Sequence, residues 1–150
     1  TPLYSSAASD VYKRQEVNTW KRKPRVYFEE WDSPMISAIL WVSEIIVLAG
    51  GNHIFSSISQ ASLAKGRIID DPQELVKNNP DIILASWCGK KFNKEEMIQR
   101  SDWNKISAIK NDFVYEIPSE IILQPGPAAL LDGLDAIHSI FKAWKEDQSN

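Results

Sequence analysis

The sequence predicts an α/β fold: a three-layer sandwich with a mainly parallel sheet of about four strands between two layers of helices. Three observations lead to this prediction. From Arg25 onward, short apolar runs alternate with stretches of helical period, which is typical of α/β domains. Residues 81–86 form an apolar run without polar alternation, as expected for a strand covered on both faces. Residues 127–146 carry the clearest helical period of the chain. In such a fold, we expect the crossovers between parallel strands to be right-handed.

The first predicted strand spans residues 25–29. Ser33 can cap a helix and Pro34 can open one, so we expect a helix to begin there. Its apolar period runs to Ala49, where Gly50-Gly51 ends it because glycine tolerates the left-handed conformation.

Residues 52–55 are predicted as a short strand, and residues 56–65 as an irregular, polar segment. Asp71 is a good N-cap for a short helix that ends before Pro80. The buried strand at 81–86 follows it.

A capped helix is expected from Asn93, with Glu96 three residues later, and a further strand at 113–117. In the last helix, the apolar stripe is predicted to consist of Leu130, Leu134, Ile137, Phe141 and Trp144.

Three loops follow the predicted parallel strands, at residues 29–32, 86–89 and 118–125. The carboxyl ends of parallel strands share one edge of a sheet, and open α/β sheets bind ligands there. The third loop ends in Pro125-Gly126-Pro127, in which both prolines fix φ. We therefore expect this loop to be held in place and the site to lie at this edge.

Composition and spacing argue against several classes of function. The 150 residues carry a net charge of −3, which is unlike a nucleic-acid-binding domain. The single cysteine, Cys88, and the two histidines, His53 and His138, lack the pattern of a nucleophile with its base. No spacing of His, Cys, Asp or Glu indicates a metal site. We therefore expect no catalytic residues, no cofactor and no enzymatic activity.

Aromatic side chains remain as the candidate ligand contacts. Trp31 and Trp87 both follow predicted strands at the expected ligand edge, where their rings would give a flat ligand large contact faces. Local packing is the alternative for both residues.

Four groups of residues occur in a characteristic order: Arg25-Val26-Tyr27-Phe28-Glu29-Glu30-Trp31-Asp32-Ser33-Pro34, then Trp41-Val42-Ser43-Glu44 with Leu48-Ala49-Gly50-Gly51, then Pro80-Asp81-Ile82-Ile83-Leu84 with Cys88-Gly89, then Pro125-Gly126-Pro127 with Asp132-Gly133-Leu134. In this order they resemble the C-terminal lobe of cobalamin-type (class III) periplasmic substrate-binding proteins of ATP-binding cassette (ABC) importers. That class also serves iron-siderophores and haem.

The resemblance implies a non-enzymatic protein that clamps a ligand between two lobes and delivers it to permease subunits outside the cytoplasm. It implies a cobalamin-like corrinoid as ligand, with an iron-siderophore or haem as the alternative within the family. A flavodoxin-like or Rossmann-like enzyme domain is the alternative from another class. The strand-end loops face the ligand in this family, which makes the following residues the candidate contacts: Glu30, Trp31, Asp32, Trp87, Cys88, Gly89, Ser119, Glu120 and Gln124.

The resemblance also implies a division of the chain. Residues 25–147 would form the C-terminal lobe, and residues 16–24 would be the remnant of the helix that connects the lobes, so that the N-terminal lobe would be missing. Residues 1–15 lack apolar periodicity, and residues 5–15 resemble translated adaptor sequence from the ends of metagenomic reading frames. We expect that segment to be a non-native or disordered extension and the chain to be a fragment.

Overall fold

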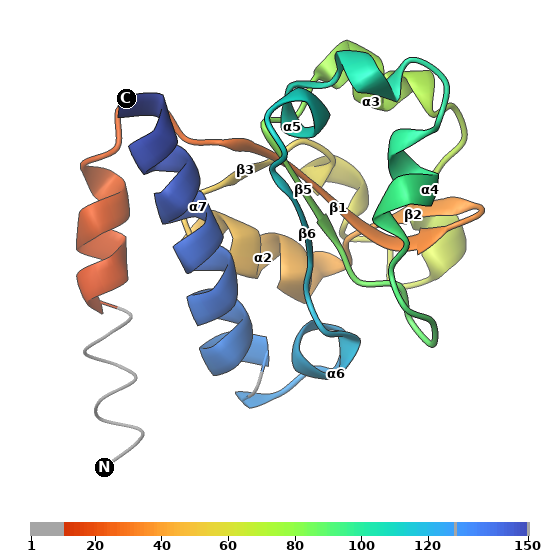
Figure 1. Cartoon of the computed structure of the whole chain (residues 1–150). Coiled ribbons are helices and arrows are strands. Elements are labelled where there is room, and N and C mark those ends of the chain that lie inside the picture. Colours follow the sequence, from red (N-terminus) through yellow and green to blue (C-terminus); the bar gives the residue numbers. More distant parts are fainter. Residues whose placement is uncertain (1–10, 128, 150) are drawn as a thin grey trace.

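The computed structural model of the chain describes residues 11–127 and 129–149. A mixed sheet lies between two layers of helices, with α2 and α7 on one side and α3, α4 and α5 on the other (Figure 1). The predicted three-layer α/β fold is therefore confirmed.

Four strands form the parallel part of the sheet, as predicted, and two antiparallel strands extend it. β1 pairs in parallel with β3 and β5, and β5 pairs in parallel with β6. β2 pairs antiparallel with β1 and with β4, so the strand order is β4-β2-β1-β5-β6 with β3 beside the start of β1. The strands are β1 (Arg25–Asp32), β2 (Met35–Ser37), β3 (Asn52–His53), β4 (Ile68–Ile69), β5 (Ile82–Ala85) and β6 (Val114–Glu116).

The helices are α2 (Leu40–Leu48), α3 (Gln73–Asn78), α4 (Lys94–Ile98), α5 (Ser107–Lys110), α6 (Ser119–Ile122) and α7 (Leu134–Ser149), with short 3₁₀ turns η1 (Ser56–Ile58), η2 (Ala64–Arg67) and η3 (Trp103–Lys105) and a π-helical turn η4 (Ala129–Gly133). Two predicted caps are confirmed. The Asn93 side chain accepts a hydrogen bond from the Glu96 amide at 3.2 Å, and the Asp71 side chain accepts one from the Gln73 amide at 2.9 Å.

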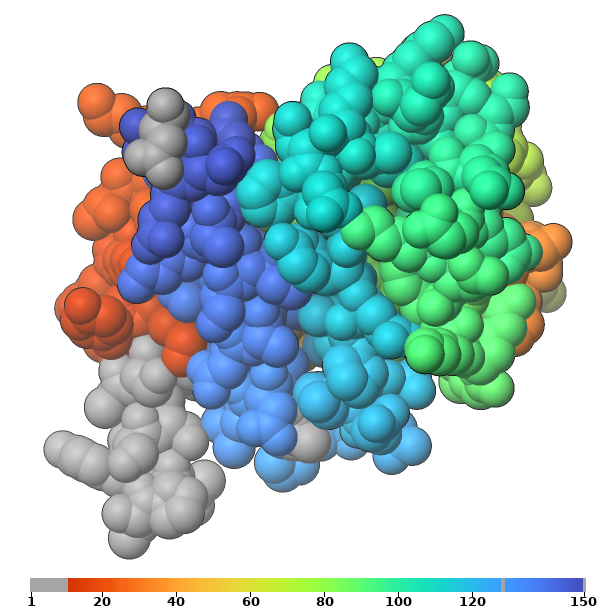
Figure 2. Space-filling model, in the orientation of Figure 1, coloured from red at the N-terminus to blue at the C-terminus, as the bar shows by residue number. Residues whose placement is uncertain are grey.

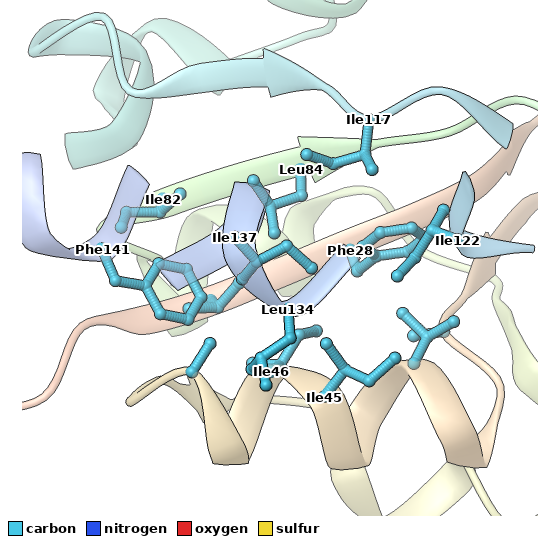
Figure 3. Close-up of a cluster of buried hydrophobic side chains, with 14 of the residues drawn as sticks. Phe28, Ile45, Ile46, Ile82, Leu84, Ile117, Ile122, Leu134, Ile137 and Phe141 are labelled. Atoms are coloured by element: carbon cyan, nitrogen blue, oxygen red, sulfur yellow. The ribbon is translucent and has the colours of Figure 1, made fainter. Parts of the chain in front are cut away.

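Alternate residues of the central strands face opposite helical layers. Phe28, Ile82 and Leu84 point toward α2 and α7, where they pack against side chains such as Ile46 and Phe141 (Figure 3). Burial of this apolar area is the main stabilising contribution that each helix receives.

Tyr27 and Ile83 face the other layer, where the fully buried Leu75, Met97 and Trp103 cover them. Both faces of β1 and β5 are therefore buried, which explains why the 81–86 run shows no polar alternation.

The predicted helix start at Ser33-Pro34 is wrong. β1 continues to Asp32, and Ser33 and Pro34 form the turn of a hairpin in which Asp32 pairs with Met35. The first helix of this region, α2, begins only at Leu40. Backbone hydrogen bonding across the hairpin, which the local signals at Ser33 and Pro34 do not encode, decides the outcome. Glu30, Trp31 and Asp32 consequently lie on a strand and not in a loop.

Two further expectations need correction. The loop at 118–125 contains one helical turn, α6, because Pro118 accepts the backbone hydrogen bonds that close it. The last helix does not have the single period that the sequence indicates, because the π-helical turn η4 precedes α7 and changes the spacing. Leu130 is consequently 46% exposed, while the four later members of the predicted stripe are buried.

Residues 11–18 are helical and pack against α7. Lys13 forms an ion pair with Asp135, and Glu16 contacts both His138 and Lys142. Of the expected non-native extension at 1–15, residues 1–10 lie outside the described residues, and residues 11–15 begin this helix. The division of the chain at residues 16–24 stays a prediction.

Candidate functional site

The carboxyl ends of β1, β5 and β6 meet at one edge of the sheet, as the loop argument predicts. Backbone hydrogen bonding to β1 continues beyond the end of β5. The Ser86 amide donates to the Glu29 carbonyl at 2.9 Å, and the Cys88 amide donates to the Glu30 carbonyl at 3.2 Å. The loop after β5 is thereby fixed beside the β1–β2 hairpin. In Figure 1, β5 and β6 run toward this loop and toward α6, which lie at the lower edge of the sheet.

An open pocket of about 490 Å³ lies between the loop after β5 and α6. Its lining consists of Ser86, Trp87, Gly89, Lys90 and Lys91 from the first segment and Glu116, Ile117, Pro118, Ser119 and Glu120 from the second. In the space-filling view these two segments, green and cyan, lie side by side (Figure 2). The pocket is thus built from two of the three predicted loops.

The Lys90 ammonium joins the pocket to the third segment, the hairpin. Its Nζ lies 4.8 Å from the centroid of the Trp31 ring and 4.9 Å from that of Trp87, and it donates to Asp32 Oδ2 at 2.8 Å. Such contacts attract a cation to the negative faces of both rings. We call these four residues, Trp31, Asp32, Trp87 and Lys90, the Lys90 site.

A buried network holds Trp87 in place. The Glu29 carboxylate, which is fully buried, accepts hydrogen bonds from Trp87 Nε1 at 3.1 Å and from the Tyr27 hydroxyl at 2.7 Å. Arg100 completes the network with two parallel bonds of 2.8 and 2.9 Å to the same carboxylate. The Trp87 ring is only 2% exposed and also contacts Phe92 edge-on. Trp87 is therefore a buried side chain whose position is fixed by its contacts.

Charge and burial shift the pKa values of three of these groups. Burial raises the pKa of Asp32, but the hydrogen bond and charge of Lys90 together with backbone hydrogen bonds outweigh burial, so the net direction of the pKa is downward. Burial lowers the pKa of Arg100, yet the bonds to Glu29 more than compensate and raise it. Burial and the neighbouring Glu29 carboxylate raise the pKa of Tyr27 well above its usual value. Asp32 and Arg100 are therefore charged and Tyr27 is neutral at pH 7.

The nine predicted contact residues divide into four groups by position. Trp31 is partly exposed on the hairpin, while Cys88, Gly89, Ser119 and Glu120 lie at or near the surface beside the pocket. Glu30 and Asp32 are tied into the protein, Glu30 by Arg67 at 2.7 Å and by the Ile39 amide at 2.8 Å. Trp87 is buried, and Gln124 is exposed but does not line the pocket.

Two residues of this site, Lys90 and Arg100, are not among the residues predicted from the sequence. Lys90 directly follows the predicted loop at 86–89, so a loop boundary one residue longer would have included it. Arg100 carries no such signal, because it follows α4 and reaches Glu29 only through the fold. Only the tertiary structure identifies it.

A second polar cluster is buried away from this edge. Hydrogen bonds join His53 Nδ1 to the Ser43 hydroxyl at 2.8 Å and His53 Nε2 to the Ser37 hydroxyl at 3.3 Å. Burial lowers the pKa of His53 to about 4. The imidazole is therefore neutral at pH 7.

Within residues 11–127 and 129–149, no group of three or more His, Cys, Asp or Glu side chains could hold a metal ion. Over the same part of the chain, no helix combines the length and apolar character needed to cross a lipid bilayer.

Comparison with known proteins gives a family and a fold. The sequence pattern of the periplasmic binding protein family matches residues 13–121. A comparison with curated protein sequences finds no match.

Among solved structures, a Listeria monocytogenes ABC transporter substrate-binding protein is similar, with 21% identity, a TM-score of 0.71, and coverage of 93% of this chain and 55% of that chain. S. aureus IsdE, solved with heme, has 18% identity and a TM-score of 0.68, with coverage of 90% and 54%. The vitamin B12-binding protein BtuF of Vibrio cholerae has 18% identity and a TM-score of 0.64, with coverage of 92% and 51%. The chain spans about half the length of each of these proteins, and at this identity the likeness establishes the fold.

Proposed function

Because this chain belongs to the periplasmic binding protein family, we propose that it acts as one lobe of the solute-binding component of an ABC importer. In this role it binds its ligand outside the cytoplasm, against a second lobe that is not part of the sequence, and delivers it to permease subunits. The protein is a carrier and not an enzyme.

One observation supports this proposal most directly: an open pocket lies at the carboxyl edge of the sheet, next to the partly exposed Trp31. An α/β sheet offers this edge to ligands because its loops converge there while its faces are covered by helices. An open surface of this kind is suited to a ligand that a second lobe covers from the other side.

The ligand that fits this role is a large ring or metal chelate with wide faces and polar edges. A cobalamin-like corrinoid is our first candidate, with haem or an iron-siderophore as alternatives. Trp31 contacts the ligand's face, and Gly89, Ser119 and Glu120 contact its edge, with Cys88 and Gln124 at the margin of the same surface. Glu30, Asp32 and Trp87 act mainly by holding this surface in shape.

A paired substitution tests the proposal on the 150-residue chain. Trp31→Ala should weaken binding of cyanocobalamin or haemin by about 1–3 kcal/mol, as expected for an aromatic anchor, and should change stability little. Equilibrium dialysis measures the affinity and urea denaturation measures the stability.

Trp144→Ala is the matched control. Trp144 is buried in the core cluster to which α2, α7 and the sheet contribute, so its removal should cost about 3–5 kcal/mol of stability. If Trp31→Ala unfolds the chain, or leaves the affinity for every ligand of this class unchanged, Trp31 is a packing residue and the proposed surface is wrong.

A further inference from the structure

The Lys90 ammonium is held in a fixed place with most of its hydrogen-bonding capacity unused. It has three N–H donors, and its one hydrogen bond to an oxygen of the described residues is to Asp32. The side chain is 41% exposed, whereas the Asp32 side chain beneath it is only 9% exposed. The remaining donors can therefore reach a ligand.

The position of this ammonium is built by the fold and does not depend on the side chain alone. Two aromatic faces and one carboxylate surround it, and the deeper face, Trp87, is itself fixed by Glu29. A lysine in open solvent loses rotamer freedom when it binds a ligand. Lys90 has already lost much of that freedom, so binding through it costs less.

The charges around the pocket are separated. Lys90 and Lys91 lie on the wall formed by the loop after β5, while Glu116 and Glu120 lie on the other wall. The Glu116 carboxylate also accepts a hydrogen bond from the Phe92 amide at 3.0 Å. The Glu116 carboxylate thus reaches the loop that carries the lysines, and a negatively charged oxygen is attracted to Lys90 and Lys91 and repelled from Glu120.

We propose that Lys90 is a specificity-determining residue that binds an anionic oxygen group, a carboxylate or a phosphate, on the edge of the ligand. This inference rests on the proposed function and deepens it. A bond between an ammonium and an ionised oxygen is stronger than a neutral hydrogen bond. The lobe therefore prefers a ligand that carries such a group over an otherwise similar ligand that lacks it.

Two pairs of probe ligands separate the sources of such an anion. Cyanocobalamin carries a phosphodiester in its nucleotide loop, and dicyanocobinamide lacks it. Haemin carries propionate carboxylates, and haemin dimethyl ester has them blocked. In each pair the ring stays the same, but cobinamide also lacks the ribose and the benzimidazole, and the ester also gains methyl groups. The contribution of the anionic group at Lys90 is therefore the part of each affinity ratio that Lys90→Met removes.

The experiment measures these ratios by absorbance titration for the 150-residue chain and its variants. For at least one pair, the unmodified chain should bind the anionic ligand about tenfold more tightly, and the pair that shows the preference identifies the anion. Lys90→Met should abolish the preference and Lys90→Arg should keep it. Lys110→Met removes the same charge from the end of α5, outside the pocket, and should also keep it.

A double variant guards against a failure to fold. Lys90→Met leaves the mostly buried Asp32 carboxylate without its cation, which destabilises a protein. Asp32→Asn combined with Lys90→Met removes both charges, and it should lose the preference in the same way.

The outcomes distinguish the two proposals. The role of Lys90 is refuted, and the proposed function stands, if the unmodified chain binds the ligands without preferring the anionic member of either pair. The same holds if Lys90→Met and the double variant with Asp32→Asn both keep the preference. If the unmodified chain binds none of the four ligands, a corrinoid and haem are both refuted as ligands in the proposed function, and this inference fails with them.

Discussion

Replacing Arg100 with methionine tests the network that holds Trp87. The Glu29 carboxylate is fully buried, and Arg100 is its only cationic partner among the described residues. Arg100→Met keeps most of the side chain's apolar length but leaves this carboxylate without its countercharge. Breaking a buried ion pair in this way typically costs about 3–5 kcal/mol.

The structure places the expected value at the low end of that range. The Tyr27 hydroxyl and Trp87 Nε1 continue to donate to Glu29 in the variant, and the Arg100 side chain is 16% exposed, so water can enter where the guanidinium was. We therefore expect a loss of about 3 kcal/mol. For a chain of this size that lowers the melting temperature by roughly 6–12 °C.

Circular dichroism during urea and thermal denaturation measures the loss without relying on the tryptophans that the substitution disturbs. The double variant Glu29→Gln/Arg100→Met is the control, because it leaves no charge in this network and should lose only about 1 kcal/mol. The reasoning is refuted if Arg100→Met lies within about 1 kcal/mol of the unmodified chain, or if the double variant is as unstable as the single one.

Two further predictions concern stability. The pKa of His53 is lowered to about 4 in the folded state against 6.5 in the unfolded chain, so the unfolded chain binds more protons between these values, and stability should fall by up to about 3 kcal/mol as the pH drops from 6.5 to 4. Urea midpoints across this range measure the pH dependence of stability, which His53→Gln should remove; an unchanged pH dependence in that variant would assign the effect to other groups. Gly51→Ala would place a Cβ 2.6 Å from the Phe141 ring and 2.9 Å from Val26 Cγ2, so it should cost about 1–3 kcal/mol through overpacking; a urea midpoint equal to that of the unmodified chain would show that this part of the core can yield.

The candidate site could be predicted from the sequence only as a location. Parallel strands place their following loops at one edge whatever the side chains are, so the proximity of residues 86–89 to α6 and the hairpin follows from the strand pattern. The roles of the two tryptophans do not follow from it. Both come at the carboxyl ends of strands in the sequence, yet Trp31 is partly exposed and Trp87 is buried. Their difference depends on Glu29, which accepts the hydrogen bond from the Trp87 indole inside the protein, and on Arg100, which binds the Glu29 carboxylate.

By itself, the sequence determined the layers and the parallel strands, because the pattern of apolar and polar residues along a short segment shows whether it is a strand buried on two faces or an amphipathic helix. The four parallel strands, the caps at Asp71 and Asn93, and the buried stripe from Leu134 to Trp144 all have such local signals. Only the tertiary structure decided the β1–β2 hairpin, the exposure of Leu130, and the Lys90 site. These depend on partners far apart in the chain, such as Asp32 with Lys90, and no local pattern records which distant groups the packed fold brings within bonding distance.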